Sequence, residues 1–156
     1  MAAFTDFAEN KLIDFIFRAQ ALGITGATAA AGTGPATLYV GLFTAAPTDT
    51  GGGTEVTGGS YARVAVTSSL ANWAGTQAAA STTASTGTSG TTSNNAAITF
   101  PAPTANWGVI TSYAVFDATT GGNPLFYGTL TTSKTVNNGD TAPSFVAAAL
   151  TFQIDN

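Results

Sequence analysis

The stretch that decides the fold spans residues 107–130 and reads WGVITSYAVFDATTGGNPLFYGTL. Apolar side chains occupy both faces of residues 109–116, which is the pattern of a central β-strand. The TTGGN cluster at residues 119–123 predicts a turn, because glycine adopts positive φ angles without a Cβ clash. Pro124 then opens a second apolar segment. We therefore expect an antiparallel hairpin whose aromatic side chains form the centre of a β-sheet core.

Short apolar segments on both sides of this hairpin predict further strands. Residues 37–44 and 61–67 alternate between faces, residues 98–100 form a short apolar segment, and residues 146–154 show the cleanest alternation. Gly- and Pro-rich turns separate these segments, which argues against a parallel sheet with crossover helices. The sequence predicts a mainly β fold, an antiparallel β-sandwich or jelly-roll-like barrel, with one N-terminal amphipathic helix.

The N-terminal segment has the spacing of a helix. Its apolar residues recur at steps of three and four, and they are Phe4, Phe7, Ala8, Leu12, Phe15, Ile16, Ala19 and Leu22. Thr5 or Asp6 can cap the start of this helix, and Gly23 provides a stop. Ile13 and Phe17 form a smaller apolar patch on the opposite side. Either a second segment of the same chain covers this patch, or the patch contacts another protein chain.

The chain is expected to form an arm and one β domain. Residues 1–36 comprise the helix and a Gly/Ala-rich linker, and residues 37–156 form a single β domain. Within that domain, residues 74–97 consist almost only of Ala, Ser, Thr and Gly. Ordering such a tract costs on the order of 20 to 40 kcal/mol of backbone entropy with little apolar burial in return. We therefore expect a low-complexity, mobile loop that only a neighbouring chain would order.

The composition excludes several kinds of chemistry. The chain has no Cys and no His, which removes Ser-His-Asp and Cys-His triads and the thiolate and imidazole zinc sites. Only 8% of its residues are charged, the net charge is −4 and its cations are scattered, so we expect no nucleic-acid partner. Because no segment has the apolar length of a membrane-spanning helix, we also expect no membrane partner.

The remaining candidate sites fit structural roles better than chemical ones. The turn after Asp117 carries too few carboxylates for a Ca²⁺ loop and fits a plain turn in which this carboxylate accepts bonds from the following amides. The acids available for a glycosidase pair all lie in turns or loops: Asp49, Glu55, Asp117 and Asp140. The large aromatic residues fit a core better than a sugar platform: Tyr61, Trp73, Trp107 and Tyr113. We expect no enzyme activity and no catalytic, metal-binding or cofactor-binding residue.

Three segments resemble a family of tailed-bacteriophage virion structural proteins, often labelled tail fibre or structural protein. They are LYVGLFTAAPTDTGGGTEVTGGSYARVAV at 38–66, the region 96–145 that opens AAITFPAPTANWG, and FTDFAENKLIDFIF at 4–17. The last is similar to the short helix that precedes the sheet in that family, so the resemblance covers nearly the whole chain. Residues 23–36 and 74–97 depart from the family's pattern as insertions.

The resemblance implies a virion protein that is made in the bacterial cytoplasm. Our leading hypothesis is a capsid cement or decoration protein on the outer capsid surface, which stabilises the shell as a small homo-oligomer, a trimer or dimer. Its partners would be the major capsid protein and its own copies. The alternative is a tail- or fibre-associated adhesin that binds a host receptor or glycan. The candidate interface residues are Phe4, Phe7, Ile13 and Phe17.

Overall fold

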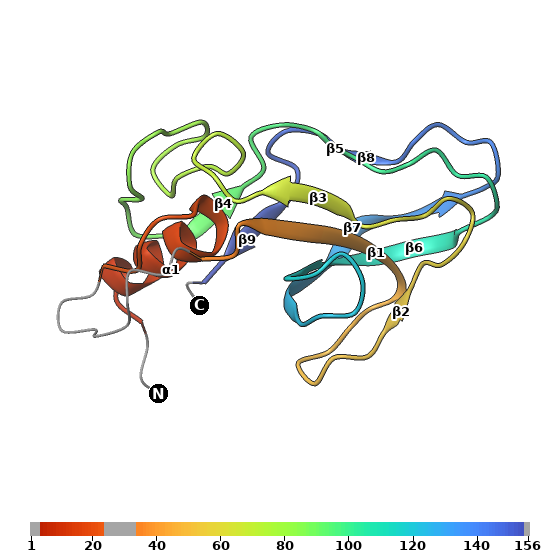
Figure 1. The fold of residues 1–156 in the computed structure, drawn as a ribbon, viewed down its shortest axis with the longest axis horizontal. Coiled ribbons are helices and arrows are strands. Elements are labelled where there is room, and N and C mark those ends of the chain that lie inside the picture. The colour runs from red at the N-terminus through yellow and green to blue at the C-terminus, as the bar shows by residue number, and fades with distance from the viewer. Residues whose placement is uncertain (1–3, 24–33, 155–156) are drawn as a thin grey trace. The chain divides into compact units, whose positions relative to one another are not determined.

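The computed structural model describes residues 4–23 and 34–154 and is mostly β, with antiparallel sheets and one N-terminal helix (Figure 1). This confirms the fold class predicted from the sequence. The helix is α1 (Asp6–Arg18). The strands are β1 (Thr37–Ala45), β2 (Thr54–Glu55), β3 (Val64–Thr67), β4 (Thr91–Ser93), β5 (Ile98–Thr99), β6 (Gly108–Phe116), β7 (Pro124–Val136), β8 (Ser144–Phe145) and β9 (Thr151–Gln153). They form one five-stranded and two two-stranded sheets.

The described chain divides into two compact units. Unit 1 combines the described residues of the ranges 1–36, 67–97 and 145–156, and unit 2 combines residues 37–66 and 98–144. The expected division was an arm at 1–36 and one β domain at 37–156. The observed division differs because α1 packs with β4 of the low-complexity tract, and β4 pairs with β9 near the C-terminus.

Unit 2 is built around the predicted hairpin, which is confirmed. The five-stranded sheet has the order β2-β1-β6-β7, and β3 also pairs with β1. Strands β6 and β7 are antiparallel, with Ala114 opposite Tyr127. In the turn between them, the Asp117 carboxylate accepts bonds from the backbone and side-chain N–H groups of Asn123, each at 2.7 Å. This is the turn geometry expected for an Asp at that position.

Aromatic residues of unit 2 contribute to its core as predicted, except that Tyr127 of the hairpin is 45% exposed. Trp107 is 5% exposed, its ring meets Tyr61 edge-on at 5.4 Å, and its indole N–H donates to the Gly59 carbonyl at 2.9 Å. Phe43 and Phe116 stack at 6.1 Å in a second cluster. With its partners satisfied, Trp107 has no face left for a sugar.

The last strand differs from the prediction of one continuous strand at 146–154. Within this range the strand is β9 alone, since Val146 is 64% exposed, Ala148 adopts a positive φ of 62°, and β8 ends before residue 146. The Asn94 side chain donates to the Val146 carbonyl at 2.8 Å and accepts from the Leu150 N–H at 2.9 Å. These bonds satisfy backbone groups that a continuous strand would have paired in a ladder.

Candidate interaction surface

Helix α1 is defined by its caps. The Thr5 side chain accepts a bond from the Ala8 N–H at 3.4 Å, which confirms one of the two predicted N-caps. The helix ends at Arg18, because Ala19 adopts the left-handed conformation with φ of 54° and the Gln20 N–H bonds to the Asp14 carbonyl at 3.0 Å. The predicted stop at Gly23 is therefore one turn too late.

The smaller apolar patch of α1 is the side that the chain buries. Ile13 and Phe17 are both fully buried within unit 1. The Phe17 ring packs edge-on against Trp73 at 4.9 Å and stacks on Phe152 at 5.0 Å. Of the two explanations left open by the sequence, the structure shows coverage by the same chain, so Ile13 and Phe17 present no surface to a partner.

A charged pair lies on the same buried side of α1. The Arg18 Nη1 group donates to the Asp14 carboxylate at 2.6 Å, and both side chains are almost completely buried. Ser85 completes this pair, since its hydroxyl and its backbone N–H both donate to Asp14, at 2.6 and 2.7 Å. The pair is therefore part of an interior network, in which the two charges offset each other and Ser85 hydrogen-bonds the carboxylate.

This network holds the Ala/Ser/Thr tract of residues 74–97. The Arg18 Nη2 group donates to the carbonyls of Ser81 and Thr83 at 2.6 and 2.8 Å, and Asn10 donates to the Gly87 carbonyl at 2.9 Å. Each hydrogen bond to a charged group contributes about 1.5 to 3 kcal/mol to the stability of the fold. These bonds offset the lack of buried apolar side chains in the tract. The expectation of a loop that only a neighbouring chain could order is therefore wrong.

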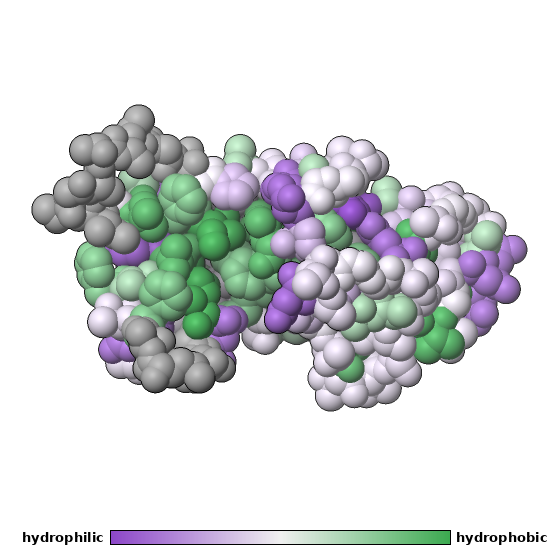
Figure 2. Space-filling model, turned by 90° about the horizontal axis from the view of Figure 1, so that it is seen from below, coloured by the Kyte–Doolittle hydropathy of each residue, from purple (hydrophilic) through white to green (hydrophobic). Residues whose placement is uncertain are grey.

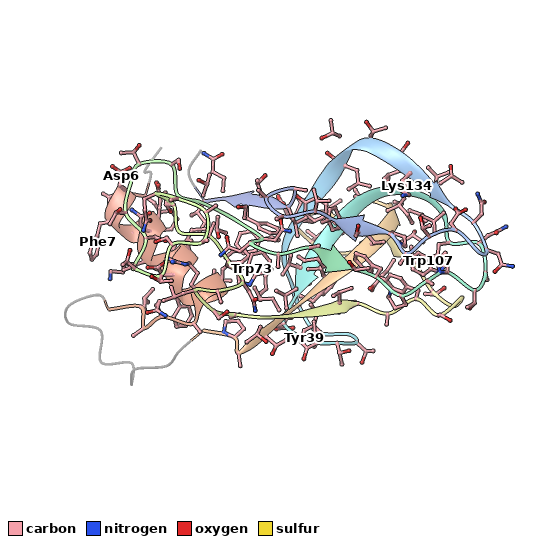
Figure 3. The ribbon with its side chains drawn as sticks, turned by 90° about the horizontal axis from the view of Figure 1, so that it is seen from above. Asp6, Phe7, Tyr39, Trp73, Trp107 and Lys134 are labelled. Carbon is pink, nitrogen blue, oxygen red and sulfur yellow. The ribbon has the colours of Figure 1, made fainter. Side chains whose placement is uncertain are left out.

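The larger apolar stripe of α1 is the less buried side. At its N-terminal end Phe4 is 61% and Phe7 58% exposed. Phe7 extends away from the helix, with the Lys11 ammonium 5.7 Å from its ring centre (Figure 3). Figure 2 shows hydrophobic residues gathered over the part of unit 1 that holds α1. Two of the four candidate interface residues thus lie on an exposed apolar surface, which we call the α1 face (Phe4 and Phe7).

Unit 2 contains a second polar cluster, which sequence reasoning missed. The Arg63 Nε and Nη2 groups donate to the two carboxylate oxygens of Glu55 at 2.8 and 2.7 Å. The Tyr61 hydroxyl donates to Glu55 at 2.9 Å and accepts from the Leu42 N–H at 2.8 Å. In the sequence, Gly41 is the residue that could have indicated this cluster, since a Cβ there would lie 2.9 Å from the Glu55 carboxylate. A glycine inside an apolar strand marks such a close approach.

The Arg63 cluster fixes the loops at one end of the sheet. Its Nη1 group donates to the carbonyls of Ala118 and Gly121 at 2.9 and 2.8 Å, and its guanidinium lies 3.4 Å from the Phe116 ring centre. Desolvation by burial raises the pKa of Tyr61 far above its ordinary range, so the phenol stays a donor. Hollows of about 350 and 270 Å³ share Glu55, Arg63 and Gly121 in their walls.

The described residues contain neither a cluster of potential metal ligands nor a membrane-spanning helix. Among residues 4–23 and 34–154, no group of three or more His, Cys, Asp or Glu side chains is placed to hold a metal ion. Within the same described residues, no helix is both long and apolar enough to cross a membrane. Unit 1 thus carries exposed aromatic side chains at the start of α1, and unit 2 carries a turn held in place by Arg63.

Comparison with known families assigns this scaffold to a class. A family model, described as Podophage GP4 fiber I protein gp80, matches residues 3–153, which include α1 and every strand. The match identifies a virion structural protein of tailed phages and confirms the resemblance seen in the sequence. The chain belongs to the Podophage GP4 fiber I protein gp80 family. A search among curated proteins found no match.

Proposed function

We propose that this protein is a non-enzymatic fibre subunit of the phage virion. The observation that carries the proposal is the family match over residues 3–153, because the family is described as a fibre protein. The match extends across both units, so it is not confined to one attached module. This description favours the fibre alternative over the capsid cement hypothesis that the sequence alone put first.

The α1 face is the surface we propose for attachment to the virion. Fully burying a Phe side chain contributes roughly 1.5 to 3 kcal/mol, and both Phe4 and Phe7 are more than half exposed. The opposite side of α1 is anchored to the tract by Arg18, so the helix holds Phe7 in place, and Phe4 lies just before the N-cap Thr5. Rigid presentation lowers the entropic cost of binding.

Two loops of unit 2 that are held in place by side-chain hydrogen bonds support a receptor-binding role for the same fibre. Arg63 ties the turn at residues 118–121 to Glu55, and the Tyr127 hydroxyl donates to Asp49 in the loop between β1 and β2. Loops held in one conformation lose little entropy when they bind a host receptor or glycan. Glycan-array binding that disappears in an Arg63→Met variant would support this role, and binding that survives unchanged would contradict it.

Location and copy number in the virion test the fibre proposal directly. Electron cryomicroscopy of whole virions, with quantitative mass spectrometry of their proteins, should place the protein in fibres at or near the tail in far fewer copies than the major capsid protein. Icosahedral positions over the shell, with copies comparable to the capsid protein, would instead establish the cement role and overturn the proposal.

A paired variant tests the α1 face separately. Phe4→Ser together with Phe7→Ser should prevent incorporation into virions in a complementation assay, while the thermal melt of the purified protein stays unchanged. Val146→Ser is the matched control, because Val146 is also in unit 1 and is 64% exposed, but lies off the helix. Equal incorporation of the paired variant and the control would exclude attachment through this face.

A further inference from the structure

Two hollows of unit 2 share the Glu55–Arg63 pair in their walls, and we call them the paired hollows. The larger, of about 350 Å³, is lined by residues 55–58, 61–63 and 119–121. The smaller, of about 270 Å³, lies among the sheet, the loop between β1 and β2, and the β6–β7 turn. Sites for small molecules commonly measure about 300 to 1,000 Å³, so the larger hollow alone has room for a ligand the size of one sugar ring.

The charges in the lining offset each other. Among the described residues that line the paired hollows, Glu55 and Arg63 alone are charged, and they form an ion pair at 2.7 Å. Most N–H groups of Arg63 are already engaged by Glu55 and by two backbone carbonyls, and its side chain is only 7% exposed. An anionic ligand would therefore meet the Glu55 carboxylate without a free cation to bind it. A metal ion would find a single carboxylate, which is too few for a Ca²⁺ site.

Glu55 retains the capacity to accept a hydrogen bond from a ligand. Its Oε1 atom accepts from both Tyr61 and Arg63, at 2.9 and 2.8 Å. Its Oε2 atom accepts from Arg63, and within the described residues no second donor reaches it. A carboxylate oxygen has two acceptor positions, and the Glu55 side chain is 24% exposed. A hydroxyl group of a ligand can therefore donate a charge-assisted bond to Oε2.

Three threonines add further hydrogen-bonding groups to the larger hollow. Thr57, Thr119 and Thr120 line it and are exposed. Across the described part of the chain, no side-chain hydrogen bond involves their hydroxyls. Each hydroxyl can both donate and accept. The large apolar residues of the lining offer little surface, since Phe43, Val56 and Phe116 are 6% exposed or less. The lining thus favours an uncharged ligand that carries several hydroxyl groups.

The loops around the paired hollows are held in place from two directions. Arg63 Nη1 fixes the β6–β7 turn through the carbonyls of Ala118 and Gly121. The loop between β1 and β2 is tied to β7 by the Tyr127 hydroxyl, which donates to Asp49 at 2.5 Å. Because these walls are already ordered, a ligand that enters them pays little conformational entropy.

We infer that the paired hollows bind a neutral saccharide through its hydroxyl groups, with Glu55 Oε2 as the main acceptor. A hexose ring is uncharged and carries several hydroxyls, which match the free carboxylate oxygen and the threonines of the lining. Binding of this kind needs no aromatic platform, in agreement with the burial of Trp107. The inference rests on the receptor-binding role proposed above, and it adds the class of glycan and the residues that contact it.

NMR titration of the purified, isotope-labelled protein tests the class of ligand. The neutral probes are the methyl glycosides of glucose, galactose, mannose, rhamnose and N-acetylglucosamine, and the acidic probes are glucuronate and galacturonate. At millimolar concentrations, at least one neutral glycoside should shift the amides of residues 55–58 and 119–121. Both acidic probes should bind roughly tenfold more weakly, because Glu55 repels them. Glu55→Gln should reverse this preference, since it leaves Arg63 without its counter-charge.

Threonine variants test the site without disturbing the ion pair. Thr57→Val with Thr120→Val replaces hydroxyls by methyl groups of similar shape and should weaken binding of the best neutral glycoside about tenfold, with an unchanged thermal melt. Thr131→Val with Thr132→Val is the matched control, because both residues are exposed in β7 and line neither hollow. This control should bind the glycoside as the wild type does.

Four results would each overturn the inference. They are no shift with any of the five neutral glycosides, shifts confined to other parts of the chain, acidic probes that bind as tightly as the neutral ones, and Thr57/Thr120 variants that bind as the control does. A tail location in the virion together with any of these results would leave the fibre proposal intact. A capsid location together with glycoside binding in the paired hollows would overturn the fibre proposal alone.

Discussion

The two arginines hold similar loops in different surroundings. Arg18 joins one carboxylate, Asp14, to two carbonyls of the low-complexity tract, and Arg63 joins Glu55 to two carbonyls of the β6–β7 turn. The first ion pair has side-chain exposures of 0% and 3%, and the second has 7% and 24%. Both order segments that lack core-forming residues. Because the Arg18–Asp14 pair is the more deeply buried, we expect it to contribute more to the free energy of unfolding than the Arg63–Glu55 pair.

Removing Arg18 should have the largest effect. Arg18→Met leaves the Asp14 charge buried without its partner, which costs about 3 to 5 kcal/mol of unfolding free energy. Urea denaturation measures this loss, and hydrogen exchange should show the amides of residues 76–87 losing protection. Lys11→Met is the control on the same helix and should change stability by less than about 0.5 kcal/mol. An Arg18→Met variant as stable as this control would contradict the claim that the buried ion pair contributes most to stability.

Removing Arg63 should have a smaller effect that is local to unit 2. Arg63→Met forfeits charge-assisted bonds to Glu55 and to the 118–121 turn, worth about 2 to 3 kcal/mol. Arg63→Lys should recover only part of this, because an ammonium cannot make the forked contact. NMR line widths of residues 118–122 report whether the turn is released. A turn that stays fixed in both variants would show that Arg63 does not hold it.

A smaller loss is expected where the Arg63 cluster approaches β1. Gly41→Ala places a Cβ against the Glu55 carboxylate and the Tyr61 hydroxyl, costing about 1 to 2 kcal/mol of unfolding free energy. Glu55→Ala removes one of these neighbours, so the cost of Gly41→Ala should fall in that background. If the losses of unfolding free energy from Gly41→Ala and Glu55→Ala simply add in the double variant, the cost of Gly41→Ala does not come from contact with Glu55.

The smallest effect concerns the turn carboxylate Asp117. The hydrogen bonds from Asn123 hold the pKa of Asp117 below its ordinary value. A folded-state pKa that is depressed contributes stability above the unfolded-state pKa, and this is lost as the pH falls through the folded value. NMR titration of the Asp117 carboxyl should therefore give a midpoint below that of an unperturbed Asp. Asn123→Ala should raise that midpoint, and an unchanged midpoint would refute the assignment.

Local patterns in the sequence predicted the parts of the fold that depend on neighbouring residues. The hairpin of β6 and β7, the Asp117 turn and the buried Trp107 all follow from alternation and turn chemistry. The buried side of α1 could not be predicted in this way. Apolar periodicity favours the side with Phe4 and Phe7, whereas the structure buries the side with Asp14 and Arg18 because Ser85 completes their hydrogen bonds.

Contacts between distant segments account for the rest of what the sequence did not predict. The tract at residues 74–97 looked unable to order because its own side chains supply no core, yet Arg18 and Asn10 of α1 satisfy its carbonyls. The Arg63 cluster was missed for the same reason, as its partners come from separate turns. Of the predicted interface residues, Ile13 and Phe17 are internal, and a partner for Phe4 and Phe7 stays a prediction.

The three-part construction of unit 1 has a consequence for the order of folding. Phe17 is synthesised long before its ring partner Phe152 and the strand β9. Unit 2 ends at Ser144 and can form first. Pulsed hydrogen exchange during refolding should therefore protect β1 and β6 before α1, since distant contacts form slowly. Until β9 is made, Phe17 lacks the ring of Phe152, and the incomplete core of unit 1 leaves the nascent chain prone to aggregate.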